Sequence, residues 1–82
     1  MFQHNYITII PDETGKPIET PRQMVTHQAS HATDILVIWQ NQRQEDNVTF
    51  RLVDTAPFTG DESQLKWSLV SRVCSLYVAH LH

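Results

Sequence analysis

Two histidines four positions apart are the sharpest chemical motif in this sequence. His27 and His31 lie in a segment that we expect to be helical, where positions i and i+4 share a face and two imidazoles can bind one metal ion. A structural zinc site needs four ligands and a catalytic one three. Asp34, His4 and His80 are the only plausible additions, and no pattern brings them together. We therefore expect solvated histidines, with no metal and no other cofactor, and a metal-binding small domain is kept as a second alternative function.

Trp39 and Phe50 form a second candidate, because on neighbouring strands, with Arg51 nearby, they resemble an aromatic platform for RNA bases. A core role for both rings is the stronger interpretation, since Phe50 continues a regular apolar alternation and its surroundings are acidic. The net charge of −3 also argues against a nucleic-acid partner. A small nucleic-acid-associated regulator remains the alternative if the fold gathers scattered cations on one face; these are Lys16, Arg22, Arg43 and Arg51.

Catalytic motifs are absent from the sequence. There is no G-x-S-x-G turn and no Gly-rich phosphate loop, and the chain holds only two glycines. Asp61 and Glu62 suit the start of a helix better than the roles of general acid and base. We expect a protein that is not an enzyme.

The polar segment 41–47 has the length of a hairpin loop. Projecting polar loops often carry binding residues. We predict a candidate recognition loop here, made of Gln42, Arg43, Gln44 and Glu45.

Length and composition indicate a single globular domain, residues 1–82, with 40% hydrophobic and 18% charged residues. Cys74 has no second cysteine to pair with, which fits a reducing compartment, and we expect its thiol in the core. The chain shows neither a leader pattern nor the roughly 18 consecutive apolar residues that cross a bilayer. A cytoplasmic protein with no membrane partner is expected.

The elements that must position these residues begin with a strand over residues 5–10, followed by a turn over residues 11–15. Residues 16–19 favour a short second strand, which Pro17 restricts to a sheet edge. Thr20, Pro21 and Gln23 are start signals for a short helix that runs to Ala32.

Residues 34–40 contain a continuous apolar run that is rich in β-branched side chains, and this favours a central strand buried on both faces. Residues 48–53 alternate between apolar and polar, which predicts a half-exposed strand. The short connection between them predicts antiparallel pairing.

The last 24 residues, 59–82, are interpreted as one long helix, because residues 59–62 match a capping box and no Gly or Pro follows them. Helical spacing gives two adjacent apolar stripes, too wide for one contact layer. The expected fold class is α+β: a small antiparallel sheet, in the order β-(β)-α-β-β-α, covered on one face by this helix.

That surplus of apolar surface leads to a functional hypothesis: a small non-enzymatic interaction or regulatory module that binds itself as a homodimer, another protein, or both. Aromatic side chains dominate such interfaces. The predicted interface residues are Trp39, Trp67, Val70, Cys74, Tyr77 and Leu81.

Overall fold

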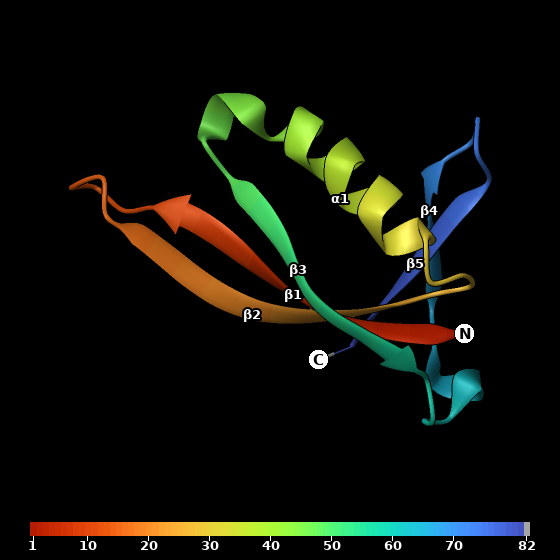
Figure 1. Ribbon diagram of the computed structural model, residues 1–82. Helices are drawn as coiled ribbons and strands as arrows, with labels where there is room; N and C mark the ends of the chain where they lie inside the picture. Colours follow the sequence, from red (N-terminus) through yellow and green to blue (C-terminus); the bar gives the residue numbers. More distant parts are fainter. Residues whose placement is uncertain (82) are drawn as a thin grey trace.

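The computed structural model describes residues 1–81, which form five strands and one α-helix (Figure 1). The elements are β1 (Phe2–Pro11), β2 (Pro17–Thr26), α1 (His31–Gln42), β3 (Thr49–Pro57), β4 (Trp67–Ser71) and β5 (Leu76–Leu81), with short 3-10 turns η1 (Gln44–Asp46) and η2 (Glu62–Gln64). The strands make one antiparallel sheet in the order β3-β1-β2-β5-β4.

The β1–β2 hairpin forms the middle of this sheet. It confirms the strand predicted over residues 5–10 and the turn after it. The Asp12 carboxylate holds the turn by accepting from the backbone amides of Thr14 at 2.8 Å and Lys16 at 2.9 Å. Gly15 adopts φ of 85°, a conformation that glycine alone takes without steric cost. The short strand expected over residues 16–19 is the first part of β2.

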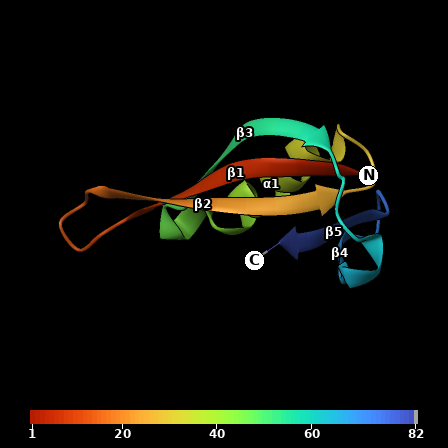
Figure 2. The same cartoon turned by 90° about the horizontal axis from the view of Figure 1, so that it is seen from below.

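Helix α1 packs on one face of the sheet and leaves the other face without a helix (Figures 1 and 2). Ala32, Ile35 and Leu36 are its buried residues, a spacing of three and four that places them on one side. They meet sheet residues in a single core cluster; the buried sheet members are Tyr6, Met24, Leu76 and Val78. The main core cluster therefore lies between α1 and the sheet, while Val25 and Ala79 are buried outside this cluster.

The strand predicted over residues 34–40 is wrong, because this segment is the middle of α1. Its β-branched content suggested a strand, but the positions that are buried follow the helical period, while Val37 is 55% exposed. A continuous apolar run of this length does not distinguish a buried strand from a helix by itself. Packing on the sheet outweighed the weak intrinsic preference of these residues.

The helix predicted over residues 20–32 is also wrong, because residues 17–26 form β2. Its last part pairs on both sides: Met24 and Val25 lie opposite β1 and also opposite β5. Both side chains are fully buried, which a thin surface helix would not have provided.

The fold class predicted from sequence is wrong at the C-terminus, where no long helix forms within residues 59–81. The predicted capping box does not start a long helix: the N-cap is Asp61 and not Thr59, and its carboxylate accepts from the Ser63 amide at 3.0 Å to cap only the three-residue η2. The segment beyond it forms the β4–β5 hairpin, whose turn includes Ser75 at φ of 51°. Because β5 pairs with β2, backbone N–H and C=O groups at the edge of β2 are hydrogen-bonded. A helix over residues 59–81 would have left these groups unpaired.

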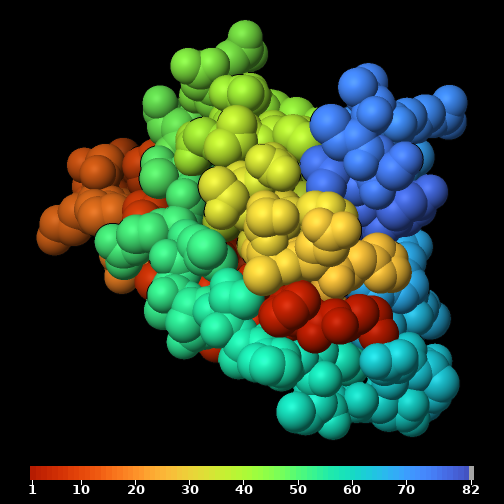
Figure 3. Space-filling model, turned by 45° about the vertical axis from the view of Figure 1, so that its right-hand side comes forward, coloured from red at the N-terminus to blue at the C-terminus, as the bar shows by residue number. Residues whose placement is uncertain are grey.

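The start of the chain is anchored at the end of β3, where the Phe58 amide donates to the Met1 carbonyl at 3.0 Å. Figure 3 shows the first residues in red against the teal and cyan segment that follows β3. Among residues 1–81, no helix has the length and apolar character that a membrane crossing requires.

Candidate functional site

The helix-free face of the sheet carries a group of aromatic side chains at the β4–β5 end. The His27 ring stacks on Trp67 with centroids 4.0 Å apart and meets Tyr77 edge-on at 6.4 Å. Leu69 lies directly opposite Tyr77 in the sheet, and these two side chains are 44% and 39% exposed. We call His27, Trp67, Leu69 and Tyr77 the aromatic ridge.

The same face is hollowed at its other end, over β1, β2 and β3. This hollow has a volume of about 590 Å³ and its apolar lining includes Ile7, Pro21, Val53 and Leu81. Val53 is the extra residue of a bulge in β3, since Asn5 pairs with Asp54 and Tyr6 with Leu52, and it is 55% exposed.

A polar ladder borders the hollow and fixes three strands to one another. The Gln23 amide donates to Asn5 Oδ1 at 3.0 Å, and the Asn5 amide donates to Asp54 at 2.7 Å. Arg51 lies 3.8 Å from Glu19 across β1, but both side chains are exposed and such pairs contribute little stability. The ladder therefore positions the floor of the hollow more than it stabilises the fold.

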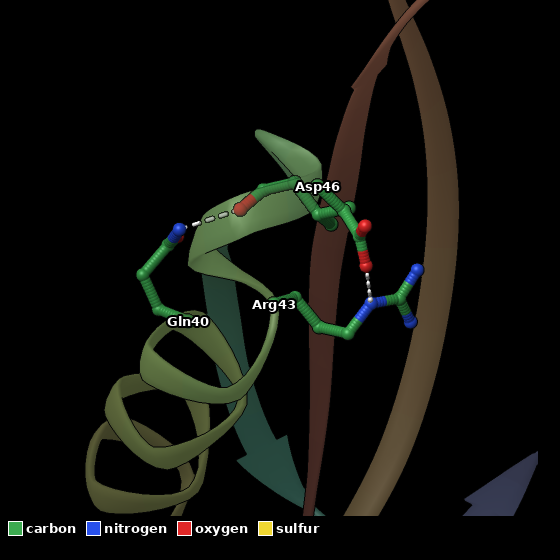
Figure 4. A network of polar contacts seen from close by, with 4 residues as sticks. Gln40, Arg43 and Asp46 are labelled. Carbon is green, nitrogen blue, oxygen red and sulfur yellow. Dashed lines mark hydrogen bonds and ion pairs between the residues drawn. The ribbon is translucent and has the colours of Figure 1, made fainter.

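The start of β3 and the unpaired part of β2 are protected against strand addition. Gln40 of α1 acts as a substitute neighbour for β3. Its side-chain amide donates to the Val48 carbonyl (Figure 4), and its Oε1 accepts from the Phe50 amide at 2.9 Å. Strand β5 pairs only with residues 23–25 of β2, and the unpaired part of β2 carries Pro17 and Pro21. Proline and bulges are devices that prevent edge-to-edge pairing.

On the helix side, a groove of about 500 Å³ opens between the C-terminal half of α1 and the β1–β2 hairpin. Trp39 is central to its aromatic floor, with the rings of Tyr6 and Phe50 each 5.9 Å away and that of His80 at 5.6 Å. Burial raises the pKa of the Tyr6 phenol, although nearby Arg22 opposes this, so the ring presents a neutral hydroxyl at neutral pH.

Comparison with known proteins gives no relative. No protein-family model, curated protein or solved structure matches the chain. Any function must therefore be argued from the geometry above.

The six predicted interface residues separate into four groups in the structure. Trp67 and Tyr77 belong to the aromatic ridge, and Leu81 lines the hollow and also reaches the groove. Val70 packs against the core cluster, as Trp39 does from α1. Cys74 was expected in the core, but it is exposed in the β4–β5 turn, so that expectation is wrong.

The predicted recognition loop begins at the end of α1 and continues into η1. Gln42 and Arg43 line the groove, whereas Gln44 and Glu45 are exposed in η1. Arg43 Nε donates to Asp46 at 3.2 Å (Figure 4). The structure thus divides the loop into a part beside a cavity and a part that faces solvent.

His27 and His31 do not share a helical face, as the metal-binding hypothesis required, because His27 follows β2 and only His31 lies in α1. Within residues 1–81, no three His, Cys, Asp or Glu side chains gather into a group suited to a metal ion. The cations considered for nucleic acid are also divided. Arg22 and Arg43 line the groove on the helix side, while Arg51 is paired opposite Ile7 on the other face.

Sequence reasoning missed the buried role of His4 and the exposed role of Leu69. His4 is fully buried, between Thr26 Oγ1 and Thr55 Oγ1, each 2.7 Å from a ring nitrogen. The alternation of His4, Tyr6 and Thr8 along one strand was the available signal. Leu69 belongs to one of the two apolar stripes that helical spacing gives, and only the period of two of a strand places it opposite Tyr77 on the exposed face.

Proposed function

We propose that this chain is a non-enzymatic interaction module that pairs with a second copy of itself through the helix-free face. The observation that carries the proposal is the aromatic ridge: Trp67, Leu69 and Tyr77 stand together, partly exposed, on the sheet face opposite α1, which no α-helix of residues 1–81 covers. Large aromatic side chains in such positions supply most of the binding energy at protein interfaces.

The choice of a second copy rests on the presence of two complementary features on one face. A two-fold axis between the ridge and the hollow lets the ridge of each copy enter the hollow of the other, which gives two identical contacts. Such self-complementary contacts are the rule in symmetric dimers. Packing two sheets face to face also covers the apolar alternation of both, as in a β-sandwich.

Size and edge chemistry agree with this mode of association. The two longer dimensions of the molecule are 42 and 27 Å, which bound a face of roughly 1,000 Å², and a standard interface needs about 800 Å² from each partner. Association through strand addition at β3 and at the open part of β2 is disfavoured by the Gln40 contacts and by the two prolines of β2. The exposed, unpaired thiol of Cys74 favours the cytoplasm as the compartment.

A cross-linking experiment tests the contact between ridge and hollow. In a Cys74→Ser background, a Leu69→Cys chain is mixed with a Val53→Cys chain under mild oxidation. We expect a mixed disulfide, because ridge and hollow meet in the dimer. The matched control is a Val73→Cys chain in place of the Leu69→Cys chain. Val73 is more exposed than Leu69, at 95%, but it lies in the β4–β5 turn. Equal cross-linking from both positions would refute the proposed contact.

A further inference from the structure

We propose that the groove on the helix side binds a small planar organic anion: an aromatic ring that carries a carboxylate or a phosphate. The groove opens on the side of the sheet opposite the proposed dimer contact. Tyr6, Arg22 and Leu81 border both cavities, but the ligand needs only one copy of the chain. Three features of the groove lead to this ligand class: its floor, its rim and one buried hydroxyl.

The floor offers a surface for a flat apolar body. Trp39 is partly exposed, and its ring is nearly parallel to that of His80, with 15° between their planes. Phe50 and Tyr6 lie at tilts of 49° and 47° to Trp39, so aromatic surface lines the floor from β1, β3, β5 and α1. Offset stacking and edge contacts favour aromatic rings in such places.

The rim is positively charged, although the whole chain carries −3. The Arg22 side chain makes no hydrogen bond or ion pair with any residue in the described part of the chain. Arg43 donates to Asp46 through Nε (Figure 4). No Asp or Glu lines the groove. Guanidinium groups fit the planar oxygens of carboxylates and phosphates.

A buried hydroxyl supplies a third contact. Thr8 lines the groove, its residue is only 9% exposed, and its Oγ1 is buried without a hydrogen-bond partner among the described residues. Buried hydroxyls are nearly always partnered. An acceptor oxygen on a bound ligand would accept a hydrogen bond from the Thr8 hydroxyl.

A small molecule fits better than an extended peptide. Peptides that bind beside a sheet gain most of their affinity from backbone pairing with an open strand. The open strand next to this groove is the first part of β2, where Pro17 and Pro21 lack amide donors. The volume of about 500 Å³ lies within the range of small-molecule sites.

Calorimetric titration with matched probes tests the assignment. The probes are naphthalene carboxylate, its neutral carboxamide and adenosine monophosphate; the last separates a nucleotide from a simple aromatic acid. We expect at least one of the two anions to bind. If naphthalene carboxylate binds more tightly than adenosine monophosphate, it should also bind about tenfold more tightly than its neutral carboxamide. Failure of both anions to bind at millimolar concentration would overturn the proposal. Tighter binding of a single-stranded oligonucleotide than of either small anion would also overturn it.

Variants locate the site. Arg22→Gln and Arg43→Gln should each weaken binding of the anion by about tenfold, since each removes a charged hydrogen bond. Thr8→Ser should keep the affinity, and Thr8→Val should lower it. Arg51→Gln, on the opposite face, is the matched control and should have no effect. Equal losses of affinity from Arg22→Gln and Arg51→Gln would contradict the assignment. Tyr77→Asp, which disrupts the proposed dimer contact, should leave the affinity for the anion unchanged, and a changed affinity would also contradict it.

Discussion

His4 Nε2 donates to Thr26 Oγ1 across the β1–β2 pair, at a distance of 2.7 Å in a fully buried position. The direction follows from Thr26, whose hydroxyl donates its own proton to the Gln28 carbonyl at 2.6 Å and so can only accept from the ring. Burial favours the neutral form of this imidazole, and in that form Nδ1 accepts from the Thr55 hydroxyl. Both ring nitrogens of a neutral His4 then have a hydrogen-bond partner.

The first prediction is a loss of stability in mild acid. Burial lowers the pKa of the His4 imidazole, whereas in the unfolded chain it titrates near the ordinary value of about 6.5. The unfolded state therefore binds more protons below that pH. The contribution of His4 to the unfolding free energy is fully present above pH 6.5. It should fall on acidification by at most about 1.4 kcal/mol per pH unit.

Denaturant unfolding at several pH values measures this slope. His4→Gln keeps one donor and one acceptor but cannot titrate, so its slope should be shallower than that of the parent chain. Thr26→Ser retains the acceptor and serves as the control, with an unchanged slope. An unchanged slope in His4→Gln would show that His4 does not cause the effect.

The second prediction concerns the face of α1 that meets the sheet. Ile35 is fully buried, so Ile35→Ala should cost about 2 to 5 kcal/mol of unfolding free energy through lost burial and a cavity. Val73→Ala, at a residue that is 95% exposed, should stay within about 0.5 kcal/mol. Equal costs would mean that the helix is packed in another register.

The third prediction concerns the edge of β3. Gln40→Ala leaves the Phe50 amide and the Val48 carbonyl without their side-chain partner, which should cost about 1 kcal/mol. Amide hydrogen exchange at Phe50 should accelerate, while exchange in the middle of β1 keeps its rate. The control is Gln42→Ala, at an exposed position of the same helix. Unchanged protection at Phe50 would mean that the Gln40 contact is not formed in solution.

How much of this fold could be predicted depended on which residues settle their conformation locally. The turn at residues 11–15 was predictable because Asp12 and Gly15 determine it through short-range contacts. The alternation around Phe50 likewise predicted β3. Residues 34–40 and 59–81 were misassigned because their apolar patterns fit two periods, and long-range pairing decided between them.

The candidate site was predictable only in composition. Trp67 and Tyr77 were named because aromatic side chains dominate interfaces, and that argument does not depend on secondary structure. Their grouping with His27 requires β4 beside β5 and cannot follow from a helical spacing. The groove was beyond prediction, since Thr8, Arg22 and Arg43 come from three elements and meet only in the folded chain.

The most direct test of the account is the molecular mass in solution across a dilution series, for the parent chain, for Leu69→Asp with Tyr77→Asp, and for Val73→Asp. The two ridge positions are exposed enough to accept a carboxylate without unfolding, which circular dichroism verifies. We predict a dimer for the parent and for Val73→Asp, and a monomer for the double variant. A parent chain that stays monomeric at every concentration, or a double variant that stays dimeric, would contradict the account.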